Sequence, residues 1–373
     1  MRPYLELDGE GPLYEQLSRA LKRSILEGRF GAGKRLPATR ALSKELGLSR
    51  NTVLGAYEML CTEQLVTADG RSGTYVTEDV RRQVKEGQPK TVEPQSRYSA
   101  RLRRLHDVTR GSRQPTPRYN PAYGESLPDP RLLQSWRRKL AAAALRVGRR
   151  YPDPSGFPAL RRAIAEHVVR RRGINCTEKE VLIVGGTQQA VTLLARVLLN
   201  EGDEVAVEDR QGQSVVQGLL AHGAQVRHVR TDEFGLVTAN LAHSPPRLIC
   251  ESPSHQSPSG SIFPLERRTE LLGIAAKHGT WIMEDDCGGE SPNRGQSMAA
   301  LRSLDLWDRV IYVGSFSKTL FPSLRLGYVV CPESLRTDLC AAKRLDDLGS
   351  PEILQVALAA FIRSGQFAKY QRQ

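Results

Sequence analysis

Apolar residues recur at every fourth position near the start of the chain, at Leu13, Leu17, Leu21 and Ile25. This spacing predicts an amphipathic helix over residues 13–27, because side chains four positions apart share one face of a helix. Glycines then interrupt the chain, and a short second helix is expected over residues 39–46, ending at Gly47. Ser49 is placed to cap a third helix.

Two short strands are expected after the third helix, over residues 65–67 and 73–76, with a polar turn between them. A helix, a helix–turn–helix and a two-stranded hairpin, in this order, make a winged helix-turn-helix. The sequence therefore predicts a winged helix-turn-helix domain over residues 1–78.

The third helix opens with Arg50, Asn51 and Thr52. The first turn of a recognition helix meets base edges in the major groove, where Arg pairs with guanine and Asn with adenine. Arg40 in the second helix and Arg71 in the wing are placed to hold the DNA backbone. On the pattern alone, the alternative is an ordinary polar surface on a three-helix unit.

The second half of the chain alternates short apolar runs with helical patterns. Strands are expected over residues 181–184, 204–207, 248–250, 281–283 and 310–313, and helices include residues 188–199 and 265–278. This alternation predicts an α/β domain with a mostly parallel sheet, which binds ligands at the carboxyl ends of its strands. We place this domain at residues 118–373.

The net charge of +13 is concentrated in the middle of the chain. Residues 79–150 hold 18 basic and 6 acidic residues, whereas residues 151–373 hold 25 of each. Such a segment either attracts a polyanion or is a solvated tether kept extended by like charge. Residues 79–117 are also rich in Arg, Gln, Pro and Ser, so we expect a basic linker without structure of its own.

The six cysteines form no CxxC pair, and no apolar run reaches the ~18–20 residues that span a bilayer. The first residues lack the apolar core of a secretory signal. These features predict a cytoplasmic protein with reduced thiols and no membrane partner.

Several polar groups follow the predicted strands. Gly185, Gly186 and Thr187 open a helix, and a glycine turn at a helix start presents N–H groups that suit a phosphate, although many such turns are glycine-rich for steric reasons alone. Three acids, Glu284 to Asp286, follow another strand. No further ligands follow at the spacing that a metal site needs, so a metal site is not favoured. The favoured interpretation is that one of these carboxylates faces a protonated ring nitrogen.

The last predicted strand leads into Ser315, Ser317 and Lys318, with Arg325 seven residues later. A lysine in a mostly apolar setting can have its pKa lowered and form a Schiff base with an aldehyde. Arg325 and the serines would grip a phosphate. Together with the glycine turn, these residues describe a pyridoxal phosphate pocket.

Residues 28–76 resemble the GntR-type DNA-binding domain almost end to end, through the G-x-R-L-P-x-x-R lead-in, the S-R-x-T-V recognition helix and the G-T-Y-V wing. This resemblance assigns DNA contacts to Arg40, Arg50, Thr52 and Gly73. Asn51 and Arg71 are added on their chemistry.

The second domain resembles fold-type I aminotransferases, in particular the aminotransferase-like half of MocR-type regulators. The matching segments include YPDPSG at 151–156, GTQQ at 186–189, EDD at 284–286 and GSFSKTLFPSLRLGY at 314–328. The resemblance implies that Lys318 carries pyridoxal phosphate as a Schiff base and that Asp285 pairs with the pyridine nitrogen. It assigns phosphate contacts to Arg325, Ser315, Ser317, Gly186 and Thr187.

Four departures from the family pattern weaken the expected cofactor site. Cys287 replaces a tyrosine that bonds the phenolic oxygen, Gly212 replaces a tyrosine that stacks on the ring, and Ser257 replaces an asparagine. The chain also ends 55 residues after Lys318, where the family continues into a small C-terminal domain, so that domain is expected to be missing. These changes predict weakened cofactor binding and little or no aminotransferase turnover.

We therefore expect a homodimeric regulator that binds a double-stranded DNA operator and senses a small amine, an amino acid or a compound related to pyridoxal phosphate. Two alternatives stay open. One is an aminotransferase with an accessory DNA-binding domain, and the other is a DNA-binding remnant that has lost its cofactor.

Overall fold

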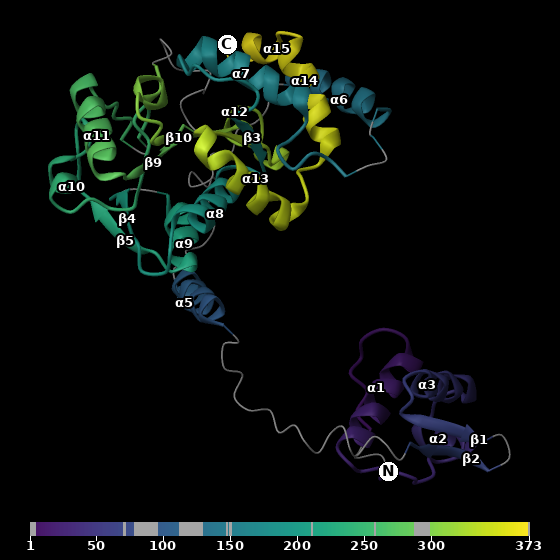
Figure 1. Cartoon of the computed structure of the whole chain (residues 1–373). Helices are drawn as coiled ribbons and strands as arrows, with labels where there is room; N and C mark the ends of the chain where they lie inside the picture. The colour runs from purple at the N-terminus through teal and green to yellow at the C-terminus, as the bar shows by residue number, and fades with distance from the viewer. Residues whose placement is uncertain are drawn as a thin grey trace. The chain divides into compact units, whose positions relative to one another are not determined.

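The computed structural model describes residues 5–69, 72–77, 96–111, 130–146, 148, 151–209, 212–256, 259–286 and 299–371. The chain divides into two compact units, Met1–Gln95 and Ser96–Gln373 (Figure 1). Each unit has its own hydrophobic core, so each has the packing that an independently folded domain needs.

The first unit is a winged helix-turn-helix, as the sequence predicts. Its elements are α1 (Leu13–Leu26), α2 (Thr39–Leu46), α3 (Arg50–Thr62), β1 (Val66–Asp69) and β2 (Gly73–Val76). Of the periodic residues of α1, Leu17, Leu21 and Ile25 are buried against α3, whereas Leu13 is exposed. The same core includes Leu42, Val53 and Leu60. Gly47 ends α2 in the left-handed conformation at φ 70°, which a glycine adopts without steric cost.

A third segment pairs with the wing, which the sequence pattern did not reveal. β1 and β2 pair antiparallel, with Val66 opposite Val76. Residues just before α2 run along the other side of β2, where Arg35 forms a bridge with Tyr75 and the Leu36 N–H donates to the Thr74 carbonyl at 2.8 Å. The wing is therefore tied to the entry of the helix–turn–helix.

Part of the expected linker is structured, which corrects the prediction for residues 79–117. Residues Arg97–Gly111 form helix α5, which belongs to the second unit. Arg101 fastens it to the body by donating to the Ala221 carbonyl at 2.8 Å and to Glu201 at 3.1 Å. Because this anchor is an arginine rather than an apolar stripe, the weak hydrophobic periodicity concealed it. The rest of the predicted linker lies outside the described residues.

The second unit is built on a seven-stranded sheet in the order β3-β11-β10-β9-β8-β4-β5. Its strands are β3 (Val181–Val184), β4 (Glu204–Glu208), β5 (Gln225–Val229), β8 (Leu248–Glu251), β9 (Trp281–Asp285), β10 (Val310–Ser315) and β11 (Gly327–Val330); β6 (Thr231–Asp232) and β7 (Gly235–Leu236) form a separate ribbon. β11 is antiparallel to both neighbours, and the other six strands share one direction. The mostly parallel sheet is confirmed.

Helices cover both faces of this sheet (Figure 1). One face packs on α8 (Thr187–Leu198), α9 (Gln213–His222) and α13 (Glu333–Asp347). The other packs on α11 (Leu265–His278) at one end and on α6 (Pro130–Ala144), α7 (Pro158–Arg172), α14 (Glu352–Arg363) and α15 (Gln366–Tyr370) at the other. The shorter segments are α10 (Ala239–His243), η2 (Leu301–Leu304), α12 (Phe316–Thr319) and η3 (Pro322–Leu324).

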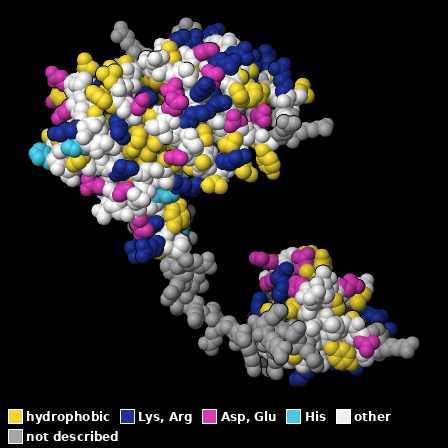
Figure 2. Space-filling view, viewed as in Figure 1, with side chains coloured by type: hydrophobic (Ala, Val, Ile, Leu, Met, Phe, Trp, Pro, Cys, Tyr) yellow, Lys and Arg dark blue, Asp and Glu magenta, His cyan; other side chains and the backbone are white. Residues whose placement is uncertain are grey.

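Basic residues of α6 and α7 reach the surface of the second unit. Arg137 and Arg138 of α6 and Arg170 and Arg171 of α7 are exposed. Figure 2 shows Lys and Arg side chains gathered at the upper right of this unit, where Figure 1 places α6. None of the helices in the described ranges combines the length and the apolar character needed to cross a membrane.

We predict that Tyr57→Phe destabilises the first unit by about 1 kcal/mol, because the buried Tyr57 hydroxyl donates to the Pro37 carbonyl at 2.7 Å and holds α3 against the entry of α2. Tyr14→Phe is the matched control, since the Tyr14 side chain is exposed. Chemical denaturation of both variants measures the effect. Equal loss in the two variants would contradict the role given to the Tyr57 hydrogen bond.

Candidate functional site

The predicted cofactor residues meet at one edge of the sheet. β3, β9 and β10 end there, and the antiparallel β11 begins there. In the register of the sheet, Ser315 lies opposite Gly327, and Gly327 lies opposite Val184 just before the glycine turn. Asp285 lies opposite Val313, two residues before Ser315.

The glycine turn and Arg325 form a close cradle. Gly186 has φ 102°, and a β carbon there would lie 3.5 Å from both terminal nitrogens of Arg325. A β carbon on Gly327 would lie 3.0 Å from the Gly186 α carbon and 2.8 Å from the Gly314 carbonyl oxygen. The guanidinium therefore lies against bare backbone beside the start of α8, where Thr187 is the first helical residue. A helix start and an arginine together favour a phosphate.

The two serines lie at the start of α12. Ser315 caps this short helix, and its hydroxyl accepts the Ser317 N–H at 3.2 Å. The Ser317 hydroxyl oxygen is buried and has no hydrogen-bond partner among the described residues. A buried hydroxyl in this condition is costly unless a ligand satisfies it. Lys318 follows within α12, and its side chain lies outside the described part of the structure.

The three acids after β9 have different surroundings. Glu284 accepts the N–H groups of Leu301 and Arg302 at 2.8 and 2.9 Å. Asp286 forms a buried ion pair with Arg172 at 2.8 Å. Because two of the three carboxylates are committed to protein groups, a three-carboxylate metal site does not fit. The half-buried Asp285 ends β9 at the shared edge of the sheet.

The pairing of Asp286 with Arg172 was not found from the sequence. Tyr312 of β10 also donates its hydroxyl to Asp286, and Arg172 donates to the Ser254 hydroxyl at 2.7 Å. These contacts join α7, β9, β10 and the loop after β8. They fix the backbone that follows directly after Asp285.

Three buried glutamates, Glu208, Glu251 and Glu284, lie at the ends of the neighbouring strands β4, β8 and β9. Glu208 accepts the Ser252 N–H at 3.0 Å, whereas neither carboxylate oxygen of Glu251 has a hydrogen-bond partner in the described ranges. Burial, together with the nearby carboxylates of Glu284, Glu208 and Asp285, raises the pKa of Glu251 well above its ordinary value, against the opposing charge of Arg268. The protonated form of Glu251 is therefore favoured more strongly than in an exposed glutamate.

The residues that depart from the family pattern are only partly described. Gly212 is exposed and immediately precedes α9. Cys287 and Ser257 lie outside the described residues.

The predicted DNA-contacting residues cluster at the start of α3. Ser49 caps the helix by accepting the Thr52 N–H at 3.0 Å, and its hydroxyl lies 2.8 Å from the Thr52 hydroxyl oxygen. Arg50 and Asn51 are exposed beside this cap. The capped first turn therefore presents two long polar side chains to solvent, the arrangement that major-groove recognition uses.

Arg40 is exposed in the first turn of α2, and Gly73 begins β2 with φ 119°. The Arg35 guanidinium packs on Gly73 so closely that a β carbon there would lie 2.6 Å from Nε of Arg35. Sequence reasoning assigned no role to Arg35, although its place in the lead-in before α2 was a usable signal. Arg71 lies outside the described residues.

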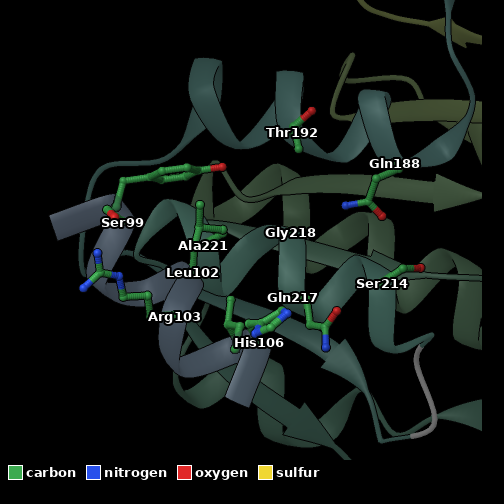
Figure 3. A pocket seen from close by; sticks show the side chains of 12 residues that line it. Ser99, Leu102, Arg103, His106, Gln188, Thr192, Ser214, Gln217, Gly218 and Ala221 are labelled. Atoms are coloured by element: carbon green, nitrogen blue, oxygen red, sulfur yellow. The ribbon is translucent and has the colours of Figure 1, made fainter. Parts of the chain in front are cut away.

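A separate groove of about 740 Å³ lies between α5, α8 and α9 (Figure 3). Leu102, Arg103 and His106 line it from α5, while Gln188 and Gln217 line it from the other two helices. None of the predicted cofactor residues lines this groove. Its lining contains no acidic side chain among the residues described.

Comparisons with known proteins match both units. A family model for aminotransferases of class I and II matches residues 120–372, and a model for bacterial regulatory proteins of the gntR family matches residues 13–76. The chain is similar to the archaeal alanine:glyoxylate aminotransferase, with a TM-score of 0.62 and 24% identity over 74% of this chain and 70% of that one. It is also similar to LysN, the alpha-aminoadipate aminotransferase of Thermus thermophilus, with a TM-score of 0.61 and 28% identity over 67% and 66% of the two chains. The second unit therefore has the aminotransferase fold.

Similarity to regulators extends over both units. The chain is 35% identical to the probable rhizopine catabolism regulatory protein MocR of Rhizobium meliloti, over 99% of this chain and 75% of that protein. It is 35% identical to the HTH-type transcriptional regulator TauR of Rhodobacter capsulatus, over 98% and 77%. The chain belongs to the MocR-type regulators, in which a GntR-family winged helix-turn-helix is joined to an aminotransferase-like domain.

We predict that Glu251→Gln stabilises the protein increasingly as pH rises above the ordinary glutamate pKa. Because its pKa is raised in the folded state, Glu251 contributes stability that is present below its ordinary pKa near 4.5 and lost as pH rises toward the raised value. Glutamine does not titrate, so up to about 1.4 kcal/mol per pH unit is recovered. Melting temperatures of parent and variant across this range test the expectation.

Glu233→Gln is the matched control, because it makes the same change at an exposed glutamate and should leave the melting temperature close to that of the parent at every pH. Parallel melting curves for the parent and Glu251→Gln would show that the pKa of Glu251 is not raised.

Proposed function

We propose that the winged domain binds a DNA operator and that the aminotransferase-like domain binds pyridoxal phosphate and senses a small primary amine or amino acid through it. The observation that carries the cofactor assignment is the cradle at the strand ends. There the Arg325 guanidinium lies against the backbone of Gly186, and the buried Ser317 hydroxyl has no hydrogen-bond partner in the part of the chain that the structure describes.

The residues at the sheet edge fit the cofactor group by group. Arg325, Ser315 and Ser317, with the backbone of Gly186 and Thr187, would hold the phosphate. Asp285 would face the ring nitrogen, and Lys318 would hold the aldehyde carbon covalently. When bound, pyridoxal phosphate supplies an electrophilic carbon that primary amines attack, which is why an amine is the proposed effector class.

The ionic contacts around this edge support a binding role. The Arg172–Asp286 pair and the N–H groups that bind Glu284 fix the end of β9, so Asp285 is carried on rigid backbone. A rigid acid at one end and an arginine cradle at the other would fix the orientation of the ring between them. Gly212 cannot stack on that ring, which supports reversible sensing over rapid transamination.

A homodimer is proposed as the working form, because two winged domains related by a twofold axis would read paired half-sites on the operator. Binding of an amine in the body would change the DNA affinity only if it favours one arrangement of the two heads. A protein that acts on chromosomal operators in a bacterial cell works in the cytoplasm.

We predict that Arg50→Ala weakens operator binding by about 1–3 kcal/mol, because this side chain is exposed at the capped start of α3 and can pair with guanine. Fluorescence anisotropy with operator DNA at fixed salt measures the loss. Arg162→Ala is the matched control, since it removes the same charge from an exposed position in the second unit. Equal affinities for Arg50→Ala and the parent would refute the assignment of the recognition helix.

We predict that pyridoxal phosphate gives the parent protein a saturable visible absorbance band that Lys318→Ala lacks. Lys179→Ala, at an exposed lysine, should keep the band. Absence of the band from a folded parent protein would favour the cofactor-free alternative. Amino-acid-driven conversion of the bound cofactor to its amine form, in repeated turnovers with a keto acid, would instead favour the aminotransferase alternative.

A further inference from the structure

One side chain, that of Gln189, holds the backbone of the glycine turn. Its amide oxygen accepts the Gly185 N–H at 2.7 Å. Its amide nitrogen donates to Asp346 at 2.7 Å and to Asp347 at 3.1 Å. Both ends of this amide are thus used, and only one orientation of the group satisfies all three contacts.

The two aspartates that hold Gln189 are themselves held by cations. Asp346 forms an ion pair with Arg196 of α8 at 2.7 Å. Asp347 accepts two hydrogen bonds from Lys343, at 2.7 and 2.6 Å, and Lys343 also donates to Ser350 at 2.9 Å. Lys343 is fully buried, so its charge requires this partner.

These contacts keep both aspartates ionised. Burial raises the pKa of Asp347, but hydrogen bonds from Lys343 and Gln189 outweigh it and hold the pKa below its ordinary range. Burial likewise raises the pKa of Asp346, but hydrogen bonds from Gln189 and Arg196 outweigh this effect. The pKa of Asp346 is therefore also lowered. The carboxylates are therefore constant acceptors for the Gln189 amide at neutral pH.

The contacts join two segments that are far apart in the sequence. Gln189 lies in the first turn of α8, directly behind the turn that would hold phosphate, whereas Asp346 and Asp347 end α13. The Gly185 N–H is turned toward Gln189, and the next residue, Gly186, carries the unusual backbone against which Arg325 lies. The hydrogen bond from Gly185 to Gln189 therefore fixes the orientation of the peptide group directly before Gly186, the residue that would face the phosphate.

We propose that Gln189 is a positioning residue for the phosphate-binding turn and that the end of α13 sets the affinity for phosphate through it. This inference rests on the proposed cofactor site. It adds that phosphate affinity depends on a side chain that touches no phosphate, and that a displacement of α13 is transmitted to the cofactor.

The test compares pyridoxal phosphate with pyridoxal, which lacks the phosphate, on the full chain. Gln189→Leu leaves the Gly185 N–H without its acceptor, so it should weaken pyridoxal phosphate binding about tenfold and pyridoxal binding less than threefold. Gln189→Glu keeps an acceptor for Gly185 but places a third carboxylate against Asp346 and Asp347, so the same selective loss is expected. Gln188→Leu is the matched control, because Gln188 faces the groove beside α9.

Asp346→Ala tests the link to α13. It should lower the affinity for pyridoxal phosphate relative to pyridoxal, but less than Gln189→Leu does. The effects of the two variants should not add, since both remove the same contact. A ratio equal to the parent's in Gln189→Leu, or full additivity in the double variant, would overturn the proposal.

Hydrogen exchange of the cofactor-free protein separates this inference from the proposed function. The Gly185 amide should exchange at least tenfold faster in Gln189→Leu than in the parent, while amides of β10 remain unchanged. A parent protein that binds no pyridoxal phosphate would refute the cofactor assignment, and faster exchange would still support the positioning role. Unchanged exchange at Gly185 would refute the positioning role itself.

Discussion

Neighbouring strands that run in one direction end at one edge of a sheet, and the site of this protein depends on that constraint. Residues 185, 285 and 315 are far apart in the sequence, yet each follows or ends a strand of the same sheet. The antiparallel β11 begins at this edge just after Arg325, and its first residue, Gly327, pairs with Ser315 on one side and with Val184 on the other. Glycine at 327 is required there, because a β carbon would press on Gly186 and Gly314.

Bringing these strand ends together buries several carboxylates, and neighbouring groups of the protein offset the cost of burying their charge. Buried carboxylates gather at the ends of β4, β8 and β9, and each has a different solution. Glu284 accepts two backbone N–H groups, Asp286 pairs with Arg172, and the pKa of Glu251 is raised well above its ordinary value. Arg268 lies among them and donates to three carbonyl groups, at 2.8 to 3.0 Å, so its own charge is solvated by backbone. Backbone N–H groups, an arginine and a raised pKa therefore offset the burial of these carboxylates.

The sequence pattern was sufficient where one face of an element is apolar. The predicted limits of α2, β2, β3 and α11 agree with the structure, and Ser49 caps α3 as expected. Prediction failed where polar contacts decide the structure. Helix α5 is anchored by Arg101 rather than by an apolar stripe, and β11 was hidden because its short apolar run follows directly on the motif assigned to phosphate binding. The hydrogen bonds of Gln189 with Asp346 and Asp347 join residues more than 150 positions apart, which no local spacing indicates.

We propose that the cradle at the strand ends holds pyridoxal phosphate with its aldehyde carbon on Lys318. Borohydride reduction of the protein incubated with the cofactor, followed by peptide mass spectrometry, locates the lysine that carries it. We expect stoichiometric phosphopyridoxyl modification of Lys318, which prior addition of a small primary amine reduces. Modification spread over exposed lysines such as Lys179, with none at Lys318, would refute the assignment of Lys318.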